Sequence, residues 1–201
     1  MPEPVVYLLR HGRTASNATH RWQGQADVPL DAVGLEQAEQ AAHALASLPP
    51  ARVVSSDLSR AATTAAALGR ASGVAVESDP RLREVHAGSW EGLTREEIQH
   101  GWPAELASWA AGEDLRIGGG ERISEAGARV AAAVAEHASS TEGVLVVVGH
   151  GGALRSAVQQ MLAVGPDGRF LGTLRNAHWA VLARGRDGWV LDTWNAGVRG
   201  D

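Results

Sequence analysis

The chain has 201 residues, of which 44% are hydrophobic and 20% charged, and this suits one globular domain with a sizeable core. The net charge of −5 and the lack of any Lys/Arg run argue against non-specific binding to nucleic acid. The chain has no cysteine, which excludes disulfides, thiolate nucleophiles and zinc–thiolate sites. No apolar run approaches the roughly 20 residues of a membrane span. Residues 1–4 lack the features of a signal peptide, so we expect a cytoplasmic protein that does not bind a membrane.

The first part of the chain predicts a strand, a long loop and a helix. Val5–Leu9 is a short, β-branched apolar run of the kind that forms a fully buried strand. Residues 14–30 show no regular periodicity, and a loop of this length in a compact domain is usually functional. Asp31 is a good N-cap for the helix that follows, which ends at two prolines. The apolar stripe expected on this helix is Leu35, Ala38, Ala42, Leu45 and Leu48.

A second strand–helix pair and a third strand follow. Val53 and Val54 form a short strand, and Ser55–Asp57 supplies the cap of a helix from Leu58 to Ser72. A glycine ends that helix, and a third strand begins at Val74. The glycines and charges of residues 79–92 then indicate a loop.

Residues 94–122 depart from this alternation and form a helical excursion. Thr94–Glu97 resembles a capping box that starts a short helix. Trp102, Trp109 and three consecutive glycines come next, and we expect a lid-like segment with its hinge at Gly118–Gly120. A helix from Ser124 to Ser140 leads back to the sheet.

The last third of the chain completes the sheet. Val144–Val148 is the most apolar run and predicts a central parallel strand, followed by a helix up to Leu162. Trp179–Ala183 and Trp189–Leu191 predict an antiparallel hairpin at the sheet edge. The whole pattern predicts a single α/β domain over residues 1–201. It is a three-layer α/β/α sandwich with a mostly parallel sheet and an antiparallel edge strand near the C-terminus.

Two of the predicted strands end in a histidine. His11 follows the first strand, next to Arg10, and His150 follows the central one. The carboxyl ends of parallel strands share one edge of the sheet, which is where ligands bind in open α/β sheets. Arg60 begins a helix and Glu84 follows the third strand, so both can face the same edge. Two imidazoles, two guanidiniums and a carboxylate form an anion site suited to phosphoryl transfer.

Two other chemistries compete for these residues. Two histidines and a carboxylate can bind a metal ion, but the neighbouring arginines repel a cation. A Ser-His-Asp hydrolase would need a Gly-x-Ser-x-Gly turn, which the sequence does not contain. We therefore expect no metal and no other cofactor.

Four motifs, in order along the chain, resemble those of the histidine phosphatase superfamily, the phosphoglycerate-mutase-like proteins. They are Arg10–Thr14 with Asn17, Ser55–Ala61 with Thr64-Ala65, Glu84 with Gly88 and Gly92-Leu93, and Val147–Gly152. The resemblance implies that His11 is the phosphorylated nucleophile, that Glu84 is the proton donor and that His150 assists in catalysis. It also implies that the phosphoryl group is bound by Arg10, Arg60 and His150, with help from Asn17 and the Gly151 backbone N–H.

Within this family, four outer stretches are similar to actinobacterial glucosyl-3-phosphoglycerate phosphatases. They are Trp22–Gln25, Arg81–Trp90, Asn176–Trp179 and Leu191–Ala196. The resemblance implies that Gln23 and Gly24 line the substrate side. Indole faces suit a sugar ring, and we expect them from Trp22, Trp90 and the Trp102–Trp109 excursion. We expect Arg13 or Arg83 to bind the carboxylate of a glycerate.

These observations predict a metal-independent phosphomonoesterase that acts on a small phosphorylated metabolite such as glucosyl-3-phosphoglycerate. The alternatives are a broad-specificity acid phosphatase, a phosphoglycerate mutase and a phosphotyrosine or other protein phosphatase. A non-catalytic anion-binding regulatory module is the alternative outside the enzymes. A homodimer is compatible with the sequence.

Overall fold

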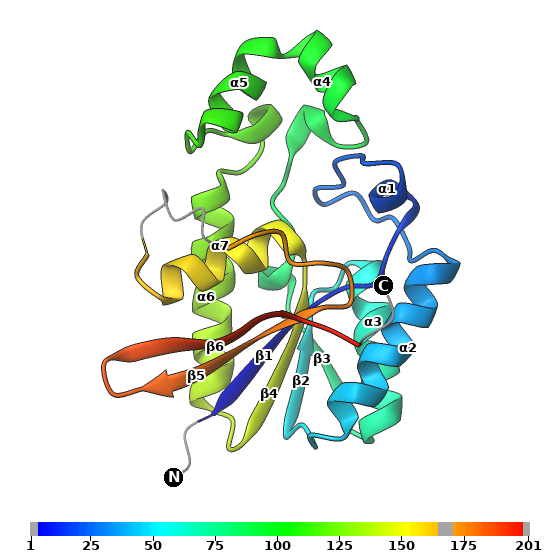
Figure 1. Cartoon of the computed structure of the whole chain (residues 1–201), viewed down its shortest axis with the longest axis vertical. Helices are drawn as coiled ribbons and strands as arrows, with labels where there is room; N and C mark the ends of the chain where they lie inside the picture. Colours follow the sequence, from blue (N-terminus) through cyan, green and yellow to red (C-terminus); the bar gives the residue numbers. More distant parts are fainter. Residues whose placement is uncertain (1–3, 165–170, 199–201) are drawn as a thin grey trace.

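A computed structural model describes residues 4–164 and 171–198. The prediction that the N-terminus is not a signal peptide concerns residues 1–4, of which residues 1–3 lie outside the described residues. The six-stranded sheet has the order β3-β2-β4-β1-β5-β6 (Figure 1). The strands are β1 (Val5–Arg10), β2 (Arg52–Ser55), β3 (Val76–Ser78), β4 (Val144–Gly149), β5 (Trp179–Gly185) and β6 (Gly188–Ala196). β1 to β4 are parallel, whereas β5 and β6 add an antiparallel edge beside β1.

Helices cover both faces of this sheet. They are α1 (Ala15–Ala18), α2 (Ala32–Ala46), α3 (Ser59–Ser72), α4 (Arg95–Gly101), α5 (Pro103–Ala111), α6 (Ile123–Ser139) and α7 (Gly151–Met161). Three short 3-10 turns also occur: η1 (Pro80–Leu82), η2 (Gly88–Trp90) and η3 (Ile117–Gly119). α2 and α3 lie on one face, and α6 and α7 lie on the other (Figure 1).

Alternate side chains of the strands pack into two separate hydrophobic cores, one on each face of the sheet. Leu8, Leu145 and Val147 pack with α6 and α7 residues such as Val130. Leu9, Val53 and Val148 pack instead with alanines of α2 and α3. Because strand side chains point alternately to the two faces, a sheet covered on both sides needs apolar residues at every position. The predicted three-layer fold is confirmed.

Two local predictions about helix surfaces were wrong. Leu35 and Leu48 are 48% and 43% exposed, while Ala38, Ala42 and Leu45 are buried as predicted. Leu48 lies beyond the end of α2 at Ala46, so it is not on the helix face. For Leu35 the cause is Gly34, which packs so closely that a Cβ there would lie 1.9 Å from the Arg13 carbonyl oxygen. This close approach turns Gly34, rather than Leu35, towards the core.

The start of α3 also differs from its prediction. Leu58 is the N-cap, and its apolar side chain cannot accept a hydrogen bond. Of the predicted cap, Asp57 is paired with Arg83, and Ser56 Oγ accepts the Leu58 backbone N–H at 3.3 Å. The Asp27 carboxylate, from the loop before α2, accepts the Ser59 backbone N–H at 2.7 Å instead. The third strand begins at Val76 rather than Val74. The segment 14–30, predicted as a loop, contains the short helix α1, which begins with a capping box formed by Thr14 and Asn17.

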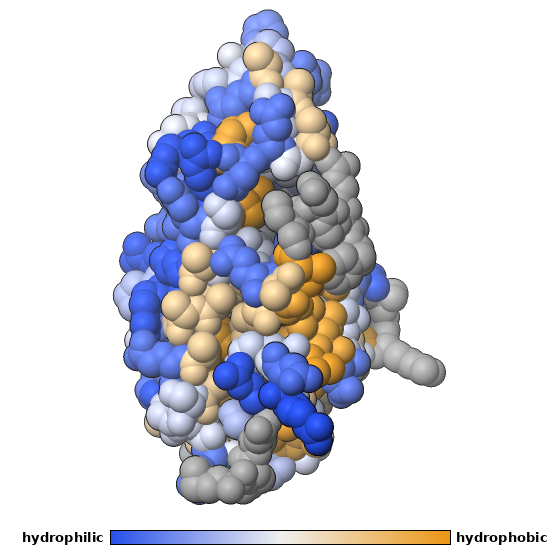
Figure 2. Space-filling view, turned by 90° about the vertical axis from the view of Figure 1, so that its left-hand side faces the viewer, coloured by the Kyte–Doolittle hydropathy of each residue, from blue (hydrophilic) through white to orange (hydrophobic). Residues whose placement is uncertain are grey.

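α4 and α5 stand beyond the carboxyl ends of the parallel strands, at the top of Figure 1. They are the two helices within residues 94–122. Gly118 packs tightly here, since a Cβ would lie 2.3 Å from the Ala87 carbonyl oxygen. Figure 2 views the α6 and α7 side, with hydrophilic residues along one margin and apolar residues gathered nearer the middle. Within residues 4–164 and 171–198, no helix is long and apolar enough to cross a bilayer.

Candidate active site

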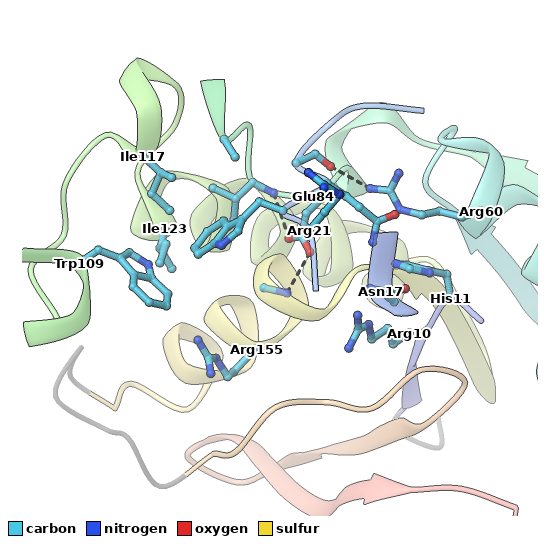
Figure 3. A pocket seen from close by; sticks show the side chains of 16 residues that line it. Arg10, His11, Asn17, Arg21, Arg60, Glu84, Trp109, Ile117, Ile123 and Arg155 are labelled. Atoms are coloured by element: carbon cyan, nitrogen blue, oxygen red, sulfur yellow. Dashed lines mark hydrogen bonds between the residues drawn. The ribbon is translucent and has the colours of Figure 1, made fainter. Parts of the chain in front are cut away.

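A cavity of about 220 Å³ opens where β1 and β4 end, beneath the α4–α5 excursion (Figure 3). Its walls come from β1, the 17–24 loop, α3, the 84–87 loop, the 109–123 excursion and α7. The lining residues are Arg10, His11, Asn17, Arg21, Trp22, Gln23, Gly24, Arg60, Glu84, Val85, Ala87, Trp109, Ile117, Ile123, Gly152 and Arg155. One side is charged and the other is largely apolar, so the cavity suits an anion with an organic body.

His11 lies just after β1 and is only 2% exposed. Its Nδ1 lies 2.7 Å from the Gly12 carbonyl oxygen, a pure acceptor, so Nδ1 carries the ring proton. Burial lowers the pKa of His11 well below 6.5, and the charges of Arg10 and Arg60 lower this pKa further. The ring is therefore neutral, with the lone pair of a nucleophile on Nε2.

Two guanidiniums flank this imidazole, that of the half-buried Arg10 and that of the buried Arg60. Arg10 donates from Nη1 to the Leu174 carbonyl at 2.7 Å, and its buried Nε has no hydrogen-bond partner among the described residues. Arg60 is fully buried and donates from Nη1 and Nη2 to the carbonyls of Ala26 and Gly24, at 2.7 and 2.8 Å. Burial lowers the pKa of both arginines, because it separates their charges from water. An anion here would replace that lost solvation.

His150 lies beside His11, with ring centroids 5.1 Å apart. Its Nδ1 accepts from Arg60 Nε at 3.2 Å, so in the neutral ring Nε2–H donates to Ser56 Oγ at 2.9 Å. Burial, followed by the charge of Arg60, lowers the pKa of His150 well below 6.5. The ring has no exposed surface and both its nitrogens are engaged, so it supports Arg60 and does not itself line the cavity.

Glu84 faces the cavity with its carboxylate held by three backbone N–H groups. Oε1 accepts from Val85 and Ala153, at 3.0 and 2.7 Å, and Oε2 accepts from Gly152 at 3.1 Å. Gly152 and Ala153 belong to the first turn of α7, where free N–H groups point out of the helix. The carboxylate is thus fixed in place by the element that follows β4.

Arg129 of α6 holds the backbone on the other side of Glu84. Its Nη1 donates to the carbonyls of Arg81 and Arg83, at 2.7 and 3.0 Å, and Nη2 lies 3.4 Å from the Glu84 carbonyl. Nη2 also pairs with Glu121 at 2.8 Å. Sequence reasoning missed this residue, whose only signal is an arginine next to the buried Val130.

Two side-chain amides offer their NH₂ groups to the cavity. Asn17 Oδ1 accepts from the Thr14 backbone N–H at 3.2 Å and from Asn176 Nδ2 at 3.1 Å. Gln23 Oε1 accepts from the Thr14 hydroxyl at 2.9 Å. Because both amide oxygens are occupied, the NH₂ groups are the parts left to bind a ligand, and donors favour an anion.

The comparisons with known proteins agree with this geometry. The family model described as "Histidine phosphatase superfamily (branch 1)" matches residues 6–197. The chain belongs to the histidine phosphatase superfamily. This confirms the predicted family.

Relatives of this superfamily member carry two kinds of name. Glucosyl-3-phosphoglycerate phosphatase of Mycolicibacterium vanbaalenii is 37% identical over 96% of this chain and 95% of its own. A "Probable phosphoglycerate mutase GpmB" of Enterobacter sp. is 37% identical over 98% of this chain and 92% of its own. The solved mycobacterial glucosyl-3-phosphoglycerate phosphatase complexed with VO3 has a TM-score of 0.89 and 37% identity, and the match covers 96% of this chain and 99% of that one. The first and third are hydrolases of phosphate monoesters by name, the class that the sequence predicts.

Most of the predicted site residues of this histidine phosphatase superfamily member meet at one cavity. Its walls include Arg10, His11, Asn17, Trp22, Gln23, Gly24, Arg60 and Glu84. Gly151 begins α7 against Arg10, and a Cβ there would lie 3.1 Å from Arg10 Nε. Gly24 has a φ of +53° and turns its carbonyl to Arg60.

Three predictions about the substrate side were wrong. Trp90 has no exposed surface and does not line the cavity, although it supports Trp22 edge-on at 5.2 Å. Arg13 and Arg83 do not line it either, because they pair with Asp31 and Asp57. Trp102 packs against the core, and Trp109 alone of that pair reaches the cavity, 5.0 Å from Trp22.

The cavity also contains residues that the sequence did not single out. Arg21 and Arg155 add two cations, and Ile117 and Ile123 add apolar wall. Arg155 lies one helical turn after Gly152 in α7, so its position follows from the His150 motif and the period of a helix. Ile117 belongs to the excursion, whose path no motif predicts, and Ile123 is the first residue of α6, directly after it.

Proposed function

We propose that this protein is a metal-independent phosphomonoesterase that works through a phosphohistidine on His11. The observation that carries the proposal is the neutral His11 ring between Arg10 and Arg60, with Glu84 on another wall of the same cavity. His11 Nε2 has no hydrogen-bond partner among the residues that the structure describes. A non-catalytic anion-binding module would need the arginines but not a free imidazole nitrogen or a positioned carboxyl group.

In the proposed first step, the Nε2 lone pair of His11 attacks phosphorus. The P–O bond to the alcohol breaks, and protonated Glu84 gives its proton to the leaving oxygen. Arg10 and Arg60 stabilise the equatorial oxygens, with help from Asn17 and the Gly151 backbone N–H. A direct contact from His150 requires its Nε2–H to leave Ser56 for a phosphoryl oxygen.

In the second step, water gives a proton to Glu84 while its oxygen attacks phosphorus. The P–N bond breaks, which releases inorganic phosphate and returns His11 to its neutral form. Glu84 thereby regains the proton that it lost in the first step, so the cycle needs no other acid or base.

We propose a small phosphorylated metabolite as substrate, such as glucosyl-3-phosphoglycerate, in the cytoplasm. The relative named glucosyl-3-phosphoglycerate phosphatase at 37% identity supports this choice. The indoles of Trp22 and Trp109 on the apolar side of the cavity also support it, because flat apolar faces suit a sugar ring. Gln23 and Gly24 would lie beside the leaving group.

A phosphoglycerate mutase is the second candidate, because a relative of that name is equally identical. A mutase shares the first step but keeps its phosphohistidine from water. The two functions therefore differ in whether inorganic phosphate is released.

The proposed function is tested by comparing kcat/KM for four substrates: glucosyl-3-phosphoglycerate, 3-phosphoglycerate, phosphotyrosine and p-nitrophenyl phosphate. We expect the first to exceed the others by orders of magnitude, and Trp22→Ala to reduce that preference while sparing p-nitrophenyl phosphate. Similar values for all four would indicate a broad-specificity phosphatase. Interconversion of phosphoglycerates without phosphate release would instead establish a mutase.

Metal independence belongs to the same proposal and is tested separately. The imidazoles lie among guanidiniums, which form a poor field for a divalent cation. Exhaustive chelation should leave the rate unchanged. Loss of activity that zinc or magnesium restores would contradict the proposed mechanism.

We also propose that the chain forms a single domain and that residues 94–122 act as a lid on it. The domain is further proposed not to bind nucleic acid. Arg21 joins the cavity wall to α4 through Glu97 at 2.9 Å, and Arg95 lies 5.8 Å from the centre of the Trp109 ring. These contacts support the lid proposal, because they link α4 to Arg21 and Trp109, which line the cavity. The homodimer stays a prediction.

A further inference from the structure

Among the arginines of the cavity, Arg155 is the one with no hydrogen-bond or ion-pair partner in the described part of the chain. Arg10, Arg21 and Arg60 each donate to at least one backbone carbonyl, and Arg21 also pairs with Glu97. Arg155 is half-buried and forms no hydrogen bond or ion pair with residues 4–164 and 171–198. A guanidinium that is only partly hydrated and faces a cavity has five donors available for a ligand.

The position of Arg155 separates it from the phosphoryl end of the cavity. Arg10 and Arg60 lie near His11, whereas Arg155 lies towards Ile123 and Trp109 (Figure 3). On α7 it comes three residues after Gly152, whose N–H holds the Glu84 carboxylate. Three residues of helix advance about 4.5 Å along the axis. Because Glu84 marks the leaving oxygen, Arg155 stands beside the alcohol part of the ester.

The surroundings of Arg155 favour one chemical group. Trp109, Ile117 and Ile123 give that side of the cavity apolar walls, which strengthen the attraction between opposite charges. A guanidinium matches a carboxylate in two parallel hydrogen bonds. Arg13 and Arg83, the arginines first expected to bind such a group, are paired elsewhere.

We propose that Arg155 binds a carboxylate on the alcohol part of the substrate, so that the enzyme selects phosphate esters of hydroxy acids. This inference rests on the proposed phosphatase function and deepens it. It makes Arg155 a specificity-determining residue, separate from the groups that act on phosphorus. Its loss should weaken carboxylated ligands and leave the binding of a bare phosphoryl group unchanged.

The test uses p-nitrophenyl phosphate as reporter and a matched pair of competitive inhibitors. 3-Phosphonopropionate carries a carboxylate, whereas propylphosphonate has a methyl group at the same position. For the wild type we expect 3-phosphonopropionate to bind about 10- to 100-fold more tightly, the range for hydrogen bonds to charged groups. Arg155→Gln should abolish this preference without changing the inhibition constant of propylphosphonate, and Arg155→Lys should keep part of it.

Arg186→Gln is the matched control, because Arg186 is exposed in the β5–β6 turn and its loss removes the same charge. It should retain the full preference. An equal affinity of the wild type for both inhibitors, an unchanged preference in Arg155→Gln, or equal weakening of both inhibitors would each overturn the role of Arg155. Failure of the proposed function is distinguishable, since the wild type would then hydrolyse neither the reporter nor any other phosphate ester.

Discussion

The chemistry of the cavity depends on which nitrogen of His11 carries the proton. The Gly12 carbonyl fixes that proton on Nδ1, and the buried position between arginines keeps a second proton away from Nε2. Gly12 itself is required by packing, since a Cβ there would lie 2.3 Å from the Gly34 carbonyl oxygen. One backbone turn thus orients the ring that we propose as the nucleophile.

The first prediction is that His11 in the free enzyme is still neutral at pH 6.5, where an unperturbed histidine has gained half of its proton, because burial lowers the pKa of His11. Nitrogen NMR of histidine-labelled protein should show Nδ1–H and a bare Nε2 at this pH, with His11→Gln used to assign the signal. Because the unfolded chain takes up this proton near pH 6.5 and the folded one lower, acid should favour unfolding. A titration midpoint near 6.5 would contradict the arrangement described here.

The second prediction concerns Glu84. Glu84→Gln should slow esters with poor leaving groups by roughly 100- to 10,000-fold, the usual contribution of a general acid. It should slow p-nitrophenyl phosphate far less, because p-nitrophenolate leaves without a proton. Arg60→Ala touches the transferred group and should slow both kinds of ester alike. An equal loss for both leaving groups in Glu84→Gln would assign the acid to another residue.

At the residue scale, sequence motifs predicted which side chains meet but not how each is occupied. Arg10, His11, Arg60 and Glu84 line one cavity because strand ends and helix starts share an edge. Arg13 and Arg83 carry the same charge, yet Asp31 and Asp57 neutralise them. Such pairings join residues 18 and 26 positions apart, and no local pattern announces them.

At the element scale, a charge network around the buried Asp79 joins the end of β3 to α6. Asp79 is 7% exposed and accepts hydrogen bonds from Arg81 and from His137 of α6. Arg81 also pairs with Glu136 of the same helix. Burial alone would raise the pKa of Asp79, but the hydrogen bonds from Arg81 and His137 outweigh it and lower the pKa to about 2.

The third prediction is that Asp79→Asn lowers the free energy of unfolding at pH 7 by about 2 kcal/mol. The unfolded chain binds this proton near pH 3.8 and the folded chain near pH 2. The wild type should therefore lose its advantage between about pH 5 and pH 2. Denaturant unfolding at several pH values measures this, with Asp187→Asn, an exposed turn residue, as control. A difference that persists undiminished at pH 2 would contradict the role of the carboxylate charge.

Periodicity predicted the strands and the long helices well, because a sheet covered on both faces demands continuous apolar runs. It predicted helix starts less well. The N–H group at the start of α3 is bound by Asp27, which lies 32 residues earlier in the chain. Gly34 likewise changes the buried face of α2 through contact with the 12–13 backbone. Both effects come from distant segments, which single-sequence patterns do not contain.

At the scale of the whole molecule, the ends of the parallel strands bring together the proposed catalytic groups, and residues 94–122 supply part of the proposed substrate side. The order of alternating strands and helices was enough to predict which groups meet at the strand ends. The substrate side depends on how α4, α5 and η3 lie over these strand ends, because their path positions Trp109 and Ile117 in the cavity. Specificity therefore rests on the part of the fold that sequence patterns describe least.

The most direct test of the role of His11 is to trap the phosphoenzyme during turnover. Rapid quench of the wild type with labelled substrate should yield an acid-labile, base-stable adduct, and fragmentation should locate the phosphoryl group on Nε2 of His11. His11→Ala should form no adduct and lose nearly all turnover, since a methyl group cannot attack phosphorus. An adduct on another residue, or substantial activity in His11→Ala, would show that the reaction does not go through a phosphohistidine on His11.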